Sequence, residues 1–112
     1  KQIKNARLLR GFLADCPGLE LQKEPEGSRS SFLYVRARVE DPEKARHRLL
    51  GKGVDTKPDD MRNCADLDIF RPQPKCLYAR RLGGHCIEIP CSPYYPESKI
   101  MKIAAKVRRA LS

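Results

Sequence analysis

The residues best suited to binding chemistry lie in one irregular stretch just past the middle of the chain. Lys57, Asp60, Arg62 and Asn63 bring two cations, a carboxylate and an amide close together. Such groups bind phosphates and hydroxyls through charge-assisted hydrogen bonds, so this set could contact a polar substrate. The alternative is a loop whose charges simply face water. Residues 58–75, rich in Asp, Asn and Pro, predict a long irregular segment, which in a compact domain is often functional.

Cysteine thiols and a histidine could instead bind a metal or act as nucleophiles. No two of these groups form the Cys-x-x-Cys pair that fixes zinc geometry, so we predict buried free thiols and no metal site. His85 and Cys86 are adjacent in an expected strand and point to opposite faces, which argues against a nucleophile and base pair. An odd number of thiols is typical of a reduced, cytoplasmic protein. The five cysteines are Cys16, Cys64, Cys76, Cys86 and Cys91.

Two tyrosines in a proline-rich corner are further candidates. Tyr94 and Tyr95 lie between Pro93 and Pro96 and could stack on a ligand ring. A packed corner is the stronger interpretation, because proline fixes the backbone and so sets the angle at which the next helix begins. Gly83-Gly84 predicts a turn, and no Gly-rich phosphate loop is present.

The net charge of +9 raises the alternative of a basic α+β module that binds nucleic acid or another polyanion. Such a module would use Arg36, Arg38, Arg80 and Arg81 on phosphate backbones. Basic residues are interleaved with acids along the whole chain, as they are in solvated helix faces, which argues against a dedicated nucleic-acid surface. No apolar run is long enough to span a membrane.

The first half of the chain predicts two helices and three strands. Apolar spacing predicts a helix over residues 3–15, which Pro17-Gly18 ends, and alternation predicts strands over 19–23 and 31–39. A second helix begins at Pro42 after the capping residue Asp41, and Gly51 and Gly53 end it before a strand over 54–57. The strand over 31–39 should place Leu33, Val35, Ala37 and Val39 on one face and Phe32, Tyr34, Arg36 and Arg38 on the other.

The second half predicts a short helix over residues 76–82, a buried strand over 86–90 and a long amphipathic helix after Pro96. The order is therefore helix, two strands, helix, strand, loop, helix, strand and helix. This order predicts an α+β fold, with a small, mainly antiparallel sheet and helices packed on one face. Expected inward residues are Leu77, Ala79 and Leu82 in the short helix, and Ile100, Ile103, Ala104, Val107 and Leu111 in the last one.

Several short motifs occur in an order that resembles one known domain. They are Asn5-Ala6, Pro17-Gly18-Leu19, residues 31–34, residues 49–57 and residues 89–96. This arrangement resembles the C-terminal small domain of the DegT-type, pyridoxal-phosphate-dependent sugar aminotransferases, which belong to fold type I. The resemblance covers nearly the whole chain. Residues 1–112 are accordingly expected to form a single domain, a C-terminal fragment of a longer aminotransferase-like chain.

The resemblance implies a role in a larger enzyme. In such aminotransferases a large domain of the same chain supplies the Schiff-base lysine and most contacts to pyridoxal phosphate, so neither Lys57 nor Lys75 is assigned that role and no catalytic residue is expected here. The small domain would line the pocket for an amino or keto sugar, commonly nucleotide-linked, within a homodimer. By itself this chain should bind no cofactor and catalyse no transamination.

One segment departs from the family pattern. Many sugar aminotransferases carry a His-Tyr-Pro run followed by Leu-His, whereas this chain has Pro58-Asp59-Asp60-Met61-Arg62-Asn63-Cys64. The aromatic and imidazole contacts to the sugar nucleotide are therefore absent from this segment. The departure leaves open a catalytically silent homologue with a regulatory role.

Overall fold

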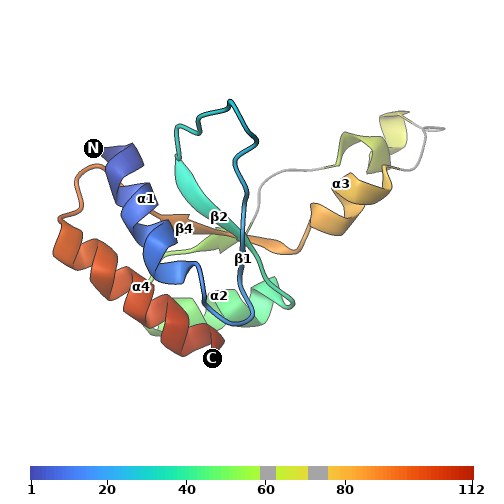
Figure 1. Cartoon of the computed structure of the whole chain (residues 1–112). Helices are drawn as coiled ribbons and strands as arrows, with labels where there is room; N and C mark the ends of the chain where they lie inside the picture. The colour runs from blue at the N-terminus through green and yellow to red at the C-terminus, as the bar shows by residue number, and fades with distance from the viewer. Residues whose placement is uncertain (59–62, 71–75) are drawn as a thin grey trace.

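The computed structural model describes residues 1–58, 63–70 and 76–112, and its elements follow the predicted order (Figure 1). In chain order they are α1 (Gln2–Leu13), β1 (Glu20–Leu21), β2 (Tyr34–Arg38), α2 (Pro42–Gly51), β3 (Lys57–Pro58), the 3-10 turns η1 (Cys64–Asp66) and η2 (Asp68–Phe70), α3 (Leu77–Leu82), β4 (Cys86–Pro90) and α4 (Glu97–Leu111).

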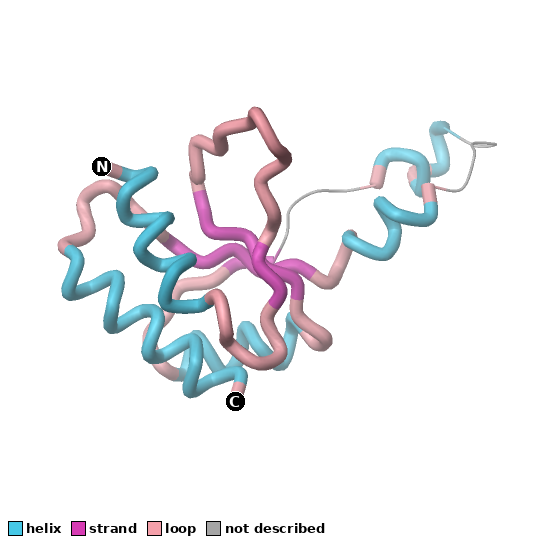
Figure 2. Tube along the Cα trace, viewed as in Figure 1, coloured by secondary structure: helices cyan, strands magenta, loops and turns pink. Residues whose placement is uncertain are grey.

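The four strands form one antiparallel sheet in the order β1-β2-β4-β3. Val35 pairs with Ile89, and these side chains lie on the face that the helices cover. The neighbouring residues point to the opposite face, where Arg36 pairs with Glu88. We call this second face the open face, because α1, α2 and α4 lie on the other side of the sheet (Figures 1 and 2).

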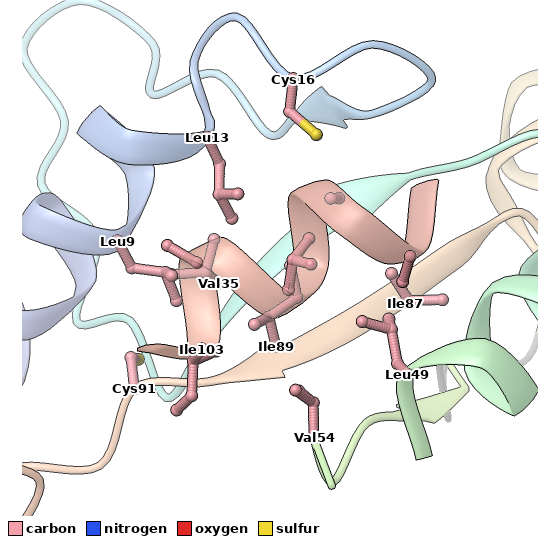
Figure 3. Packing of buried hydrophobic residues seen from close by; sticks show 14 of the residues in the cluster. Leu9, Leu13, Cys16, Val35, Leu49, Val54, Ile87, Ile89, Cys91 and Ile103 are labelled. Atoms are coloured by element: carbon pink, nitrogen blue, oxygen red, sulfur yellow. The ribbon is translucent and has the colours of Figure 1, made fainter. Parts of the chain in front are cut away.

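The core lies between the sheet and these three helices (Figure 3). Leu9 of α1, Leu49 of α2 and Ile103 of α4 converge on Ile87 and Ile89 of β4. Each large aliphatic side chain buried in this way contributes about 1.5–3 kcal/mol relative to an exposed one. The α+β fold with helices on one sheet face is confirmed.

Two helix boundaries have the local cause that the sequence indicates. The carboxylate of Asp41 accepts a hydrogen bond from the backbone N–H of Lys44 at 2.9 Å, and Pro42 opens α2. Gly53 adopts φ +69°, which favours glycine, in the turn after α2. The strand expected over residues 54–57 was wrong at its beginning, because β3 consists of Lys57–Pro58.

The expected strand over residues 31–39 was wrong at its beginning. Phe32 has φ 51°, a left-handed conformation that interrupts extended backbone, and β2 therefore begins at Tyr34. The interruption reverses the expected alternation at Phe32 and Leu33, while Val35, Ala37 and Val39 are buried as expected. Phe32 is buried, whereas Leu33, which was expected in the core, is 71% exposed.

The expected inward face of α3 was also wrong. Leu77, Ala79 and Leu82 are all exposed, because α3 lies away from the sheet-covering helices (Figure 1). Together with η1 and η2, this helix forms a projection that we call the arm, consisting of residues 63–70 and 76–82. The spacing of apolar residues correctly predicted a helix at residues 76–82, but this helix does not pack on the sheet.

Candidate functional site

Three charged side chains lie in line across the open face of the sheet. Lys57 of β3 and Arg36 of β2 each pair in register with Glu88 of the strand between them, β4. Nη2 of Arg36 lies 2.7 Å from Oε1 of Glu88, and Nζ of Lys57 lies 3.8 Å from Oε2 of the same carboxylate. We call Lys57, Glu88 and Arg36 the polar row.

Glu88 is the buried member of the polar row, with only 6% of the residue exposed. A buried carboxylate needs compensating charge, and the bond from Arg36 supplies part of it. The second oxygen, Oε2, forms no hydrogen bond with the described residues and faces Lys57. Arg36 is thus largely engaged by the carboxylate, while the side chain of Lys57 is 46% exposed and is the more accessible cation of the row.

An aromatic ring extends the polar row. Nζ of Lys57 lies 5.1 Å from the ring centroid of Tyr34, within the range of a cation–π interaction. Tyr34 is half-buried at the beginning of β2. The surface around Lys57 therefore offers an ammonium beside a phenol, groups that can bind hydroxyl and anionic groups of a ligand.

A hollow adjoins the polar row on the side of β1. Its volume is about 360 Å³, and its lining includes Arg36, Arg38 and Cys86 on the sheet and Leu82 at the end of the arm. The hollow is thus bounded partly by sheet and partly by α3. It is large enough for a small ring, though it is open to solvent on the isolated chain.

The structure separates the four residues expected to bind substrate. Lys57 belongs to the polar row, whereas Asn63 caps η1, where its side chain accepts a hydrogen bond from the N–H of Ala65 at 3.3 Å and donates one to Asp66 at 2.9 Å. Those bonds give Asn63 a local structural role. Asp60 and Arg62 lie outside the described residues, so their assignment stays a prediction.

Sequence reasoning missed Glu88 as a site residue. The available signal was a carboxylate placed between Ile87 and Ile89 in a strand expected to be buried. A charge at such a position calls for a partner on the neighbouring strand. Arg36 and Lys57 are those partners, and the register that joins them could not be fixed without the order of the strands.

The four arginines of the alternative nucleic-acid module do not form one free basic surface. Arg36 pairs with Glu88, Arg38 with Glu20, and Arg80 of α3 with Asp66 of η1. Arg81 lines a second hollow, which it shares with Arg38 and with the acidic residues Glu20 and Glu40. Three of the four guanidiniums are thus already compensated by carboxylates, which lowers the attraction they offer to phosphate.

The cysteines lie in two groups, and none is in a disulfide. Cys16, Cys86 and Cys91 are buried, while Cys64 and Cys76 on or beside the arm are exposed. Burial raises the pKa of the Cys16 and Cys91 thiols, which disfavours the reactive thiolate. Within residues 1–58, 63–70 and 76–112, no group of His, Cys, Asp and Glu has an arrangement that could hold a metal ion.

The proline-rich turn at residues 92–96, which we call the tyrosine corner, is held by the buried side-chain amide of Asn5. Nδ2 of Asn5 in α1 donates hydrogen bonds to the carbonyls of Ser92 at 2.8 Å and Tyr95 at 3.0 Å. Tyr95 packs against the core and lies beneath Lys99, whose Nζ is 3.8 Å from the ring centroid. Tyr94 is 89% exposed and takes no part in this packing. The packed corner is thus confirmed for Tyr95 alone.

Solved sugar aminotransferases match this arrangement of elements. A DegT DnrJ EryC1 StrS aminotransferase from Brucella abortus superposes with a TM-score of 0.82 at 18% identity over 99% of this chain. The sugar aminotransferase CalS13 from Micromonospora echinospora gives 0.85 at 18% identity over 97% of the chain. DesI, crystallised with its TDP-sugar product, gives 0.78 at 20% identity over 99% of the chain.

The chain has the fold of one segment of a sugar aminotransferase. It spans only 30% of the length of each of these three structures. No protein-family model matches the sequence, and no curated protein matches it either. The likeness therefore rests on the order and packing of the elements, which agree with the resemblance seen in the sequence motifs.

None of the helices in the described part of the chain combines the length and apolar composition that a membrane crossing requires. The longest, α4, has 15 residues and carries Lys and Arg along its exposed side.

Proposed function

We propose that this chain is the small domain of a DegT-type aminotransferase-like protein. It would form one wall of the pocket for an amino or keto sugar, nucleotide-linked as in the TDP-sugar of DesI. The remaining, larger domain of the same protein would carry the catalytic groups, and two such proteins would pair as a homodimer. The chain alone would not catalyse transamination.

One observation carries this proposal. Nearly the whole chain superposes on solved sugar aminotransferases, yet it accounts for less than a third of their length. A fold that matches throughout, in a segment too short to contain the whole enzyme, is the relation expected of one domain to its parent.

Lys57 does not fit the role of the lysine that anchors pyridoxal phosphate. That cofactor supplies an electron sink when it is bound, and it needs a lysine amine for Schiff-base formation. Lys57 is engaged with the Glu88 carboxylate and the Tyr34 ring on an open sheet face. We therefore place the Schiff-base lysine in the larger domain and assign no catalytic step to Lys57.

The surface of the arm is consistent with the proposal that a larger domain packs on this chain. It carries several large apolar side chains in contact with solvent, although none of its elements contains a buried residue. Exposed apolar groups gathered in this way mark surfaces that pack on a partner. Their exposed fractions are 37% for Leu67, 82% for Ile69, 44% for Phe70, 59% for Leu77, 82% for Tyr78 and 52% for Leu82.

Lys57 is the residue we assign to substrate binding. Its ammonium would contact a phosphate or hydroxyl group of the sugar nucleotide, while Glu88 and Arg36 fix its position. Asp60 and Arg62 remain candidate contacts in the segment that follows it. A catalytically silent homologue would keep this fold and lose turnover, and the altered segment 58–64 is the feature that favours it.

Two experiments test the proposal. Sequencing the transcript that contains this segment should reveal an upstream aminotransferase body with its lysine, and its absence would overturn the proposal. In the longer protein, Lys57→Met should raise the KM for a nucleotide-linked keto sugar by roughly tenfold, the value of one charge-assisted hydrogen bond. The half-reaction with the amino donor should not change. Lys44→Met on the exposed side of α2 is the matched control.

A further inference from the structure

We propose that a groove beside α4 binds phosphate chains. The groove has a volume of about 550 Å³ and lies between α4, the turn after α2 and the tyrosine corner. Its lining includes Lys99, Lys102 and Lys106 of α4, with Gly53 and Asp55 opposite. We call it the lysine groove. This inference does not depend on the proposed function.

The three lysines share one side of α4. They are spaced by three and four residues, which places their side chains along the same helix face. The side chain of Lys106 reaches across the groove to Gly53. Its Nζ would lie 3.5 Å from a Cβ atom if residue 53 had one. From Lys99 to Lys106 the helix rises about 10 Å, so the ammonium groups form an extended row.

Within residues 1–58, 63–70 and 76–112, the lysines of the groove lack the ionic partners that neighbouring cations have. Among the residues described, none of the three pairs with a carboxylate, although Asp55 lines the same groove. On the same helix Arg108 bonds to Asp15 at 2.6 Å, and Lys4 of α1 bonds to Glu97 at 2.6 Å. Uncompensated positive charge is therefore concentrated in this hollow and attracts anions.

The shape of the groove indicates the class of ligand. A row of ammonium groups over about 10 Å matches a ligand with several linked anionic groups better than one orthophosphate. Tyr95 and the buried side of Ile103 give the groove an apolar floor. We therefore assign it a di- or triphosphate chain, which either an inorganic polyphosphate or a nucleotide could supply.

Titration calorimetry on the 112-residue chain tests the assignment, with tripolyphosphate, pyrophosphate and ADP as ligands. Tripolyphosphate should bind more tightly than pyrophosphate, and added salt should weaken both through screening. The double variant Lys102→Gln and Lys106→Gln should weaken tripolyphosphate binding by roughly tenfold or more. Asp55→Asn should strengthen binding, because it removes the one carboxylate among the described residues that line the groove.

Lys23→Gln with Lys44→Gln is the matched control, since it removes the same charge from exposed positions outside the groove. Equal weakening by the two double variants would overturn the proposal, because it would show attraction to net charge alone. An absence of tripolyphosphate binding would also overturn it, even if ADP bound. If tripolyphosphate binds and ADP binds equally tightly or more tightly, the proposal is supported, and a nucleotide is the source of the phosphate chain. Melting followed by circular dichroism checks that every variant is folded.

Discussion

The guanidinium of Arg36 donates a hydrogen bond to Glu88 at 2.7 Å from the paired position of the neighbouring strand. The bond joins the two central strands on the face that carries no helix. It allows a carboxylate to be buried in a strand between two isoleucines of the core face. The same carboxylate faces Lys57. The position of Lys57, the residue proposed to bind substrate, therefore depends on the pair formed by Arg36 and Glu88.

Glu88→Gln should destabilise the chain. The change removes the buried carboxylate charge that lies against both Arg36 and Lys57, and both cations are partly exposed, so we expect a loss of about 1–3 kcal/mol. Urea unfolding measures it. Glu20→Gln is the control, because its pair with Arg38 is exposed and should contribute at most about 1 kcal/mol. Similar losses in the two variants would contradict a special role for Glu88.

Asn5→Ala should loosen the tyrosine corner. Two carbonyls, of Ser92 and Tyr95, lose their buried donor, and we expect a cost of about 1–3 kcal/mol. Gln2→Ala serves for comparison, since Gln2 also donates to a carbonyl, that of Phe32 at 2.9 Å, but is itself only half-buried. The lower urea midpoint of the Asn5 variant should be accompanied by a changed fluorescence of the tyrosines. An unchanged midpoint would show that the corner is held by packing alone.

Thiol labelling should separate the cysteines by burial. In the folded chain Cys64 and Cys76 should react rapidly with an aromatic disulfide reagent, while the three buried thiols react only on unfolding. Cys91 is protected further because burial raises the pKa of its thiol, so fewer thiolates form near neutral pH. Mass spectrometry of timed samples identifies the sites. Fast labelling of Cys91 in the native chain would contradict the packing described here.

Acidic pH should lower the free energy of unfolding, partly because Asp15 becomes protonated. Its hydrogen bond with Arg108 lowers the pKa of Asp15 below the ordinary carboxyl value. A lowered native pKa gives stability that is present at neutral pH and is lost as the pH falls through the native value, below about pH 4. Asp15→Asn should therefore lose less stability between neutral and acidic pH than the natural chain, as urea midpoints would show. Glu26→Gln, at an exposed residue with no ion pair among the described residues, should follow the natural chain.

Much of the fold could be predicted because local rules and tertiary packing agree. Asp41 and Pro42 fixed the beginning of α2, and the apolar run at residues 86–90 coincides with β4. The errors arise where tertiary structure overrides local pattern. The left-handed conformation of Phe32 delays the alternation that the sequence predicts from residue 31, so that it holds only from Tyr34 onward. The apolar face of α3 has no sheet beneath it.

The candidate site was only partly predictable. Lys57 could be singled out because it precedes an irregular segment, and it does lie on the polar row. The row itself depends on β2, β4 and β3 being neighbours, which a single sequence does not specify. Asn63 has the residue type of a ligand contact, but its bonds within η1 show that the same amide serves equally well as a cap.

The most direct measurement is the absorption spectrum of the longer protein with pyridoxal phosphate, before and after glutamate is added as amino donor. The proposed function predicts a Schiff-base band that is replaced by the pyridoxamine form. A folded protein that shows no Schiff-base band would contradict an aminotransferase role and would favour a silent homologue.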